Sequence, residues 1–122
     1  MKVTIPSSKA VGVVIYVMEK AESIALTREV INGLEEEQLP FAVEYLEFKS
    51  CNFIEIAYQA AAQSLFGVGI CITPKEIILH YVRLPKEAPL FVISESKINV
   101  NKARLLGLNA AKLIKGIPFA EI

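Results

Sequence analysis

Three consecutive glutamates, Glu35, Glu36 and Glu37, stand out as residues whose type and spacing could bind a cation. They fall in the last turn of a predicted helix, where the macrodipole already places partial negative charge. A divalent metal ion or a basic patch on a partner would relieve this repulsion. Successive helical residues point about 100° apart, so at most one or two of the three carboxylates can share a target. Composition alone favours the simpler alternative, a solvated acidic helix end.

A metal ion at this position would need ligands from a second chain, because one glutamate cannot hold such an ion alone. The metal hypothesis is therefore a hypothesis about an interface between subunits. It would be contradicted if all three side chains lay in bulk solvent in the assembled complex.

The remaining candidates for chemistry are weak. His80, the only histidine, lies among apolar residues of a predicted strand, where a neutral imidazole usually bonds to a neighbour. Cys51 and Cys71 belong to no CxxC pair, and isolated cysteines of this kind usually serve packing. Cys71 and His80 would face each other only in one hairpin register, and the chain has no Asp to orient such a pair. We therefore predict no catalytic residue.

The glycines at positions 67 and 69 do not form a phosphate loop. Gly67-Val68-Gly69 precedes a predicted strand and opens no helix, so it cannot present a helix N-terminus to a phosphate. Such a pair more often serves a turn and close packing. We predict no cofactor-binding residue in this chain.

Hydrophobic periodicity gives the elements that must position these residues. Unbroken or alternating apolar runs predict strands, and apolar residues three and four apart predict amphipathic helices. The predicted strands cover residues 10–18, 41–48, 68–72, 77–82 and 89–94, and the predicted helices cover about 23–39, 52–67 and 103–117.

This order of elements predicts an α/β fold. With right-handed crossovers it gives a three-layer α/β/α sandwich around a mixed five-stranded sheet. We expect the strand order 2-1-3-4-5 with strand 4 antiparallel, in a single domain spanning residues 1–122. The second strand, at the sheet margin, and the alanine-rich second helix are candidate docking surfaces.

Composition argues for a protein partner. The chain has 122 residues, a hydrophobic content of 53%, and 13 basic residues balanced by 13 acidic ones. A balanced charge does not attract nucleic acid or anionic lipid, and a mean hydropathy of +0.44 favours a covered sheet or an apolar docking face. The longest apolar run, Val11 to Met18, is too short to span a bilayer, and the first six residues lack a signal-peptide pattern. We expect a cytoplasmic protein.

Three segments together resemble a known family, the small subunits of glycerol and diol dehydratase reactivating factors. The resemblance runs from Arg28 to Phe119, and its most specific part is the run KGIPF. The segments are residues 33–41 (GLEEEQLPF), residues 80–91 with HY, LP and APLF in order, and residues 109–119 (NAAKLIKGIPF).

The resemblance implies a subunit without chemistry or cofactor of its own. It implies a large ATPase partner that carries ATP or ADP, in a heterotetramer, and a cobalamin-dependent dehydratase as the target. The small subunit would take the place of the related medium subunit of the dehydratase, so that inactivated cobalamin can leave. Association with a bacterial microcompartment is a further expectation.

The resemblance also assigns the acidic residues. It implies that Glu36 helps to ligate a divalent metal, Mg²⁺, at the contact with the large subunit, with Glu35 and Glu37 at the same interface. The chain departs from the family pattern at residues 18–23 and 73–75, so contacts made by those segments are in doubt.

Two other interpretations remain. The chain could be a stand-alone cobalamin-binding or regulatory relative of the dehydratase medium subunit, which a cobalamin titration would test. It could instead be a small α/β enzyme that uses Cys71 or His80. Unchanged partner binding by a Cys71→Ser variant would remove the main support for the enzyme interpretation.

Overall fold

The computed structural model describes residues 9–47 and 52–122. The expectations for Cys51, for the first eight residues and for a strand reaching Phe48 lie outside these described residues. The elements follow the predicted order: β1 (Val13–Met18), α1 (Ala21–Glu36), β2 (Phe41–Leu46), α2 (Phe53–Ala62), β3 (Val68–Ile72), β4 (Glu76–Tyr81), β5 (Phe91–Ser94), the short 3-10 helix η1 (Glu95–Lys97) and α3 (Val100–Lys115).

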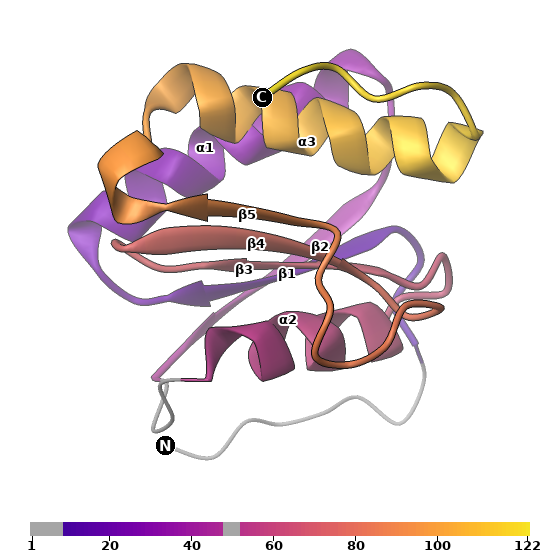
Figure 1. Cartoon of the computed structure of the whole chain (residues 1–122), viewed down its shortest axis with the longest axis horizontal. Helices are drawn as coiled ribbons and strands as arrows, with labels where there is room; N and C mark the ends of the chain where they lie inside the picture. The colour runs from indigo at the N-terminus through magenta and orange to yellow at the C-terminus, as the bar shows by residue number, and fades with distance from the viewer. Residues whose placement is uncertain (1–8, 48–51) are drawn as a thin grey trace.

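The five strands form one mixed sheet in the order β2-β1-β3-β4-β5, which confirms the prediction. Strand β1 lies parallel to β2 and β3, and β4 pairs antiparallel with β3 and β5. Helices α1 and α3 cover one face of the sheet and α2 covers the other (Figure 1). The two parallel crossovers move in opposite directions across the sheet, so right-handed connections place α1 and α2 on opposite faces.

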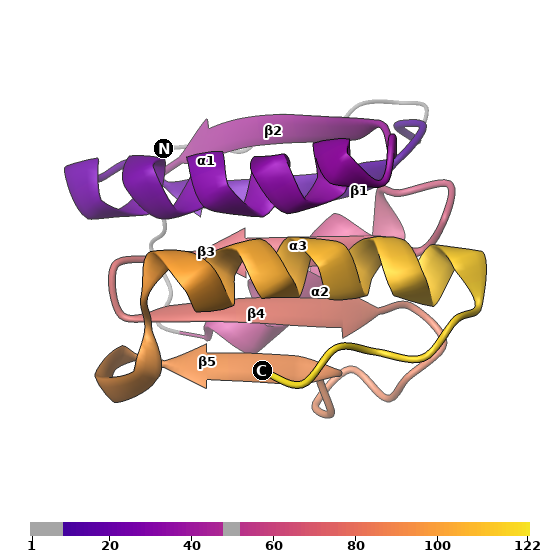
Figure 2. The same ribbon diagram turned by 90° about the horizontal axis from the view of Figure 1, so that it is seen from above.

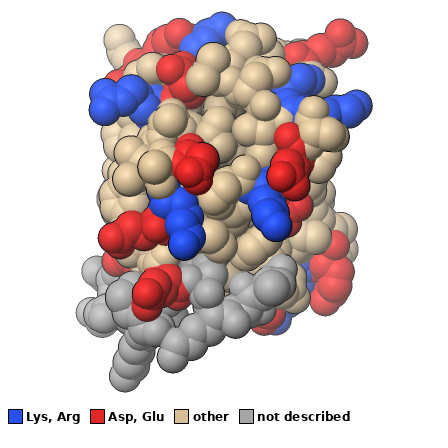
Figure 3. Space-filling model, turned by 90° about the vertical axis from the view of Figure 1, so that its left-hand side faces the viewer, with Lys and Arg blue, Asp and Glu red and all other residues tan. Residues whose placement is uncertain are grey.

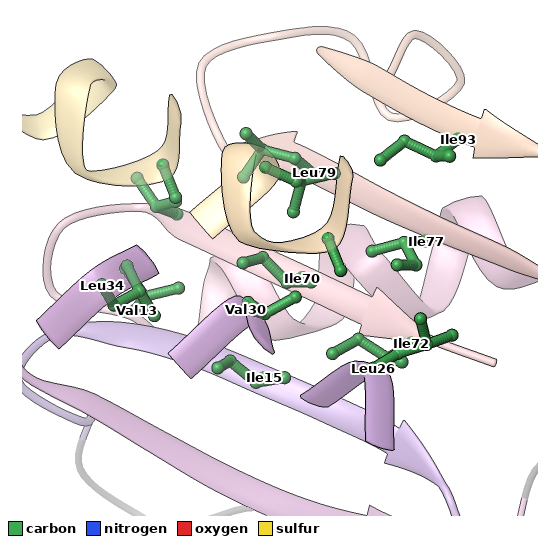
Figure 4. Packing of buried hydrophobic residues seen from close by; sticks show 14 of the residues in the cluster. Val13, Ile15, Leu26, Val30, Leu34, Ile70, Ile72, Ile77, Leu79 and Ile93 are labelled. Carbon is green, nitrogen blue, oxygen red and sulfur yellow. The ribbon is translucent and has the colours of Figure 1, made fainter. Parts of the chain in front are cut away.

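The core lies mainly between the sheet and the α1–α3 layer. Alternate residues of β1 point to opposite faces: Val13, Ile15 and Val17 face α1 and α3, whereas Val14 and Tyr16 face the α2 side. All five are buried, which explains why the β1 sequence is apolar without interruption. Figure 4 shows side chains from α1, β1, β3, β4 and β5 meeting in this layer.

Glycines set the distance between α1 and α3. A Cβ atom added to Gly33 would collide with the carbonyl oxygen of Arg104, and one added to Gly107 would collide with the carbonyl oxygen of Val30. The two helices therefore touch through their backbones at this crossing. The long-range position of Arg104 beside α1 is fixed by this contact.

The second helix is fitted to the sheet in the same way. A Cβ atom on Gly69 of β3 would collide with the backbone of α2, and the facing residues Ala57, Ala60 and Ala61 are fully buried. Gly67 has a φ of +74° in the turn before β3. These two glycines thus serve a turn and close packing, as predicted.

Helix ends differ from the predicted ones where local hydrogen bonds intervene. Helix α2 ends at Ala62, before the predicted 67, because the Ser64 hydroxyl donates to the Gly12 carbonyl at 2.6 Å and accepts the Phe66 amide at 3.1 Å. Helix α3 begins earlier than predicted, since the Asn99 side chain accepts the amide of Lys102 at 2.8 Å as an N-cap. Gly116, with a φ of +69°, caps the C-terminal end of α3 at Lys115, two residues before the predicted 117.

The C-terminal ends of α1 and α3 lie at the same end of the molecule, where β2 begins (Figure 2). No helix among the described residues is long and apolar enough to cross a bilayer.

Candidate functional site

The acidic end, which we define as Glu35, Glu36 and Glu37, closes α1. Glu36 is the last helical residue, three residues before the predicted end. The chain then turns through Gln38, whose φ of +58° is left-handed, and the amides of residues 37 to 39 bond to the carbonyls of Leu34 and Glu35. This turn satisfies carbonyl groups that the helix leaves open.

Two of the three carboxylates are paired with cations from α3. Arg104 Nη1 lies 3.2 Å from both carboxylate oxygens of Glu36, and Lys115 Nζ lies 2.8 Å from Glu37 Oε1. The last turn of α1 contains no basic residue of its own, so α3 supplies the charge that offsets the macrodipole. Lys115, and more weakly Lys112, hold the pKa of the Glu37 carboxyl below its ordinary value.

Glu35 differs from its neighbours. Its side chain is exposed, and among the described residues no cation pairs with it. The acidic end therefore presents one unpaired carboxylate, one half-exposed carboxylate shared with Arg104, and one more buried carboxylate held by Lys115. The side-chain exposures of the last two are 48% for Glu36 and 29% for Glu37.

Sequence reasoning anticipated that a cation would relieve the acidic end, but not that α3 would supply it. The signal was present in the predicted topology. Helices α1 and α3 lie on one face and run in the same direction, so their C-terminal ends meet, and Lys112 and Lys115 stand in the last turn of α3. The Arg104 contact carried no comparable signal, because Arg104 stands in the first half of α3 and not in its last turn.

The acidic end offers an incomplete metal site. Among residues 9–47 and 52–122, no three His, Cys or Glu side chains gather closely enough to hold a metal ion. Glu36 nevertheless has the hard oxygen donor that Mg²⁺ prefers, and it faces outward. The chain can therefore contribute a ligand to a shared ion but does not provide a full coordination shell.

His80 is a buried structural residue. Its Nδ1 accepts the Tyr81 amide at 2.8 Å, so Nε2 carries the proton and donates it to the Lys86 carbonyl at 2.9 Å. The ring also meets Tyr58 edge to face, with centroids 5.2 Å apart. Both nitrogens are thus occupied by backbone groups, and the imidazole fastens the segment after β4 to the sheet.

Cys71 is poorly suited to act as a nucleophile. The thiol is fully buried, and burial together with the nearby carboxylate of Glu76 raises its pKa far above the ordinary value. In the β3–β4 register Cys71 pairs with Ile78, while His80 pairs with Gly69, so the two residues do not stand opposite each other.

Strand β2 lies at the sheet edge, as predicted, and Glu44 lies within it. Glu44 is half-buried, and its Oε2 is inaccessible and without a hydrogen-bond partner among the described residues. It lies opposite Tyr16, whose pKa is raised by burial and by the Glu44 carboxylate. The neighbouring Tyr45 is instead exposed.

Two surface hollows lined by described residues are small. One of about 250 Å³ lies beside β5 and η1, and one of about 230 Å³ lies between the start of α2 and Lys86. Pockets that enclose small-molecule ligands usually measure roughly 300–1,000 Å³. Neither hollow has the size expected of a cofactor pocket.

The opposite end of the molecule carries the carboxyl ends of β1, β2, β3 and β5, where open α/β sheets usually bind ligands. The visible surface there carries positive and negative side chains side by side (Figure 3). Among the described residues of this surface, no field of one sign marks a site for phosphates or nucleic acid.

Comparison with known proteins extends over nearly the whole chain. Residues 12–120 match the family described as dehydratase medium subunit. The propanediol dehydratase-reactivating factor small subunit of Citrobacter freundii is 42% identical over 93 residues, which cover 76% of this chain and 78% of that protein. The protein of the same name from Salmonella typhimurium is 36% identical over 113 residues, which cover 93% of each chain.

A solved structure shares the fold. A chain in the structure of diol dehydratase-reactivating factor complexed with ADP and Mg²⁺ superimposes with a TM-score of 0.80 at 35% identity. The match covers 93% of this chain and all of that one. Sequence and fold agree that this chain belongs to the dehydratase medium subunit family, among the small subunits of propanediol and diol dehydratase reactivating factors.

Proposed function

We propose that this chain is the non-catalytic small subunit of a diol dehydratase reactivating factor that exchanges places with the medium subunit of a cobalamin-dependent dehydratase. One observation carries the proposal: a chain whose relatives are reactivating-factor small subunits matches the medium-subunit family over residues 12–120. Proteins that share a fold and surface can occupy the same place in an assembly. The exchange would loosen the dehydratase and allow inactivated cobalamin to leave.

The second partner in this proposal is a large ATPase subunit, with which the chain forms a heterotetramer. A solved relative is described as a complex with ADP and Mg²⁺, which supports a nucleotide in the assembly. We place that nucleotide on the large subunit, since Gly67 and Gly69 serve a turn and packing. We further propose that residues 1–122 act as one domain in the cytoplasm, or in a microcompartment that holds the dehydratase.

We propose the acidic end as the contact with the large subunit. Glu36 would give one carboxylate to a Mg²⁺ ion whose other ligands come from the partner, and the exposed Glu35 and the C-cap residue Glu37 would line the same interface. The outward position of Glu36 and its oxygen donor support this assignment. Burial of Cys71 and the bonded state of His80 support a subunit without chemistry.

The first experiment measures binding of the chain to its large ATPase subunit in Mg²⁺ and ADP. Glu36→Gln should weaken the complex about tenfold, as expected when a charged contact at an interface is lost. Glu22→Gln is the matched control, because Glu22 is an exposed acid at the opposite end of α1. If both variants bound as tightly as the unmodified chain, Glu36 would not be part of the contact.

A second experiment tests the exchange itself. Native mass spectrometry of a dehydratase mixed with the reactivating factor and ATP should detect free medium subunit and a dehydratase complex that contains this chain. Retention of every medium subunit would contradict the exchange. Tight binding of cobalamin by the chain alone would favour the stand-alone alternative instead.

A further inference from the structure

The ion pair between Glu36 and Arg104 has a geometry that bears on how the acidic end binds its cation. Arg104 places Nη1 3.2 Å from Oε1 and 3.2 Å from Oε2, so that one nitrogen sits across the carboxylate. Its second terminal nitrogen, Nη2, lies 3.5 Å from Asn101 Oδ1. The positive charge therefore occupies the position in front of both oxygens.

A metal ion and this guanidinium compete for the same carboxylate. A Mg²⁺ ion ligated by Glu36 would lie about 2.1 Å from one oxygen, and hence within about 5 Å of Nη1. Repulsion between a double and a single positive charge at that separation is comparable with the attraction of an exposed ion pair. A Mg²⁺ ion in front of this carboxylate is therefore favoured when the Arg104 side chain moves away.

The backbone of Arg104 is held in place, whereas its side chain can move. Its carbonyl oxygen packs against Gly33 at the helix crossing, which fixes the residue beside the end of α1. Its side chain is 35% exposed and holds Glu36 only through surface contacts, which exchange easily. The Lys115 pair is the contrasting case, since it is shorter, at 2.8 Å, and joins a less exposed carboxylate.

We propose that Arg104 is an internal counter-cation that occupies Glu36 in the free subunit and is displaced when the partner's divalent ion binds. This inference rests on the proposed role of Glu36 at the interface and adds a regulatory element to it. The free subunit would bind metal poorly at Glu36. The exchange of Arg104 for the ion would make metal binding dependent on the ligands that the partner adds.

The test uses Mn²⁺ as the probe on the full-length free chain, with paramagnetic broadening of the amide signals of residues 34–38 as the readout. Arg104→Gln should tighten Mn²⁺ binding about two- to fivefold, the range expected for release of an exposed ion pair. Arg104→Lys keeps the charge and should stay close to the unmodified chain. In a Glu36→Gln background, Arg104→Gln should no longer tighten Mn²⁺ binding, because the carboxylate that it frees is gone.

The outcomes separate this inference from the proposed function. Equal Mn²⁺ affinity in Arg104→Gln and the unmodified chain, or the same gain in affinity from Arg104→Gln when Glu36 is replaced by Gln, would overturn the counter-cation role. The role of Glu36 in the complex is judged separately, by binding of Glu36→Gln to the large subunit. The Mg²⁺ concentration for half-maximal assembly with the large subunit should also fall about two- to fivefold in Arg104→Gln. An unchanged Mg²⁺ concentration would overturn the inference as well.

Discussion

The pairing of α1 with α3 combines two kinds of contact. At the crossing, Gly33 and Gly107 bring backbone against backbone, and neither position has room for a single added carbon atom. At the ends of the same helices, the contact is made by long charged side chains, Glu36 with Arg104 and Glu37 with Lys115. The backbone contact at the crossing allows only one spacing of the two helices. The charged side chains at the helix ends can change partners while the helices stay in place.

This difference shows how the chain can be a rigid body with an adjustable end. Backbone contacts at the crossing depend on shape, so they are insensitive to salt and to protonation. Contacts between partly exposed charges depend on the surrounding ions and on a competing cation. A subunit that docks onto others needs both properties, since the fold must persist while the surface contact is made and broken.

The largest expected effect is on the crossing. Gly33→Ala should reduce the free energy of unfolding by about 2–3 kcal/mol, because the new Cβ would force the helix backbones apart. This loss would come despite the better helix propensity of alanine, worth about 1 kcal/mol. Urea unfolding followed by circular dichroism measures it.

Gly116→Ala provides the matched control for Gly33→Ala. A Cβ at Gly116 meets no atom within 4 Å, and the only strain comes from the φ of +69°. The expected cost is about 1 kcal/mol. If Gly33→Ala lowered the free energy of unfolding no more than Gly116→Ala, the helix crossing would be able to adjust. The contrast between a fixed crossing and adjustable helix ends would then be wrong.

An intermediate effect is expected at Asn109, a buried side chain of α3. Its Nδ2 donates to the Ala120 carbonyl at 3.0 Å, and its Oδ1 accepts the Ala120 amide at 2.7 Å. Asn109→Ala leaves both backbone groups without this partner and should cost about 1–2 kcal/mol in thermal or urea unfolding. The exposed Asn101→Ala should change stability by less than about 0.5 kcal/mol. If the two variants lowered the free energy of unfolding equally, the buried contacts of Asn109 would add no more stability than contacts at the surface.

The smallest effect on stability is expected at the Glu37–Lys115 pair, where protonation is the more sensitive readout. Lys115→Gln should raise the Glu37 pKa back toward its ordinary value of 4.5, as measured by an NMR titration of the side-chain carboxyl. Because the folded state lowers this pKa, the pair stabilises the fold above the unfolded pKa, and this contribution is lost as the pH falls through the folded pKa.

Lys112→Gln is the control for this titration. Lys112 acts on Glu37 more weakly and without the hydrogen bond that Lys115 makes, so it should raise the pKa less. A larger shift from Lys112→Gln than from Lys115→Gln would mean that Lys115 does not hold Glu37 in solution.

The sheet could be predicted from the sequence because each strand has its own recognisable pattern of apolar residues. Apolar runs and amphipathic stripes mark each element, and right-handed crossovers leave few ways to connect them. The start of α2 is also marked locally: the Asn52 side chain accepts the Glu55 amide at 3.2 Å, the contact typical of an Asn followed three residues later by a Glu at a helix start. The acidic end was found for the same reason, since three adjacent glutamates are visible in the sequence.

The partners of the acidic end could not be read in this way. Arg104 and Lys115 lie 68 and 78 positions from the glutamates they bind, and side-chain type alone does not select one cation among thirteen. The predicted end of α1 lay three residues too far along the chain. The left-handed backbone of Gln38 stops the helix, and glutamine is not a residue type that indicates such a conformation.

The hydrogen bonds of His80 join two segments into one cooperative unit. The imidazole accepts a hydrogen bond from the Tyr81 amide and donates one to the Lys86 carbonyl, so opening of the segment around Lys86 leaves the buried ring nitrogen Nε2 without its partner. Local opening of this segment is therefore coupled to the stability of β4. In hydrogen–deuterium exchange, the segment between β4 and β5 should gain protection from the sheet, and a peptide spanning residues 80–90 should exchange as a single block.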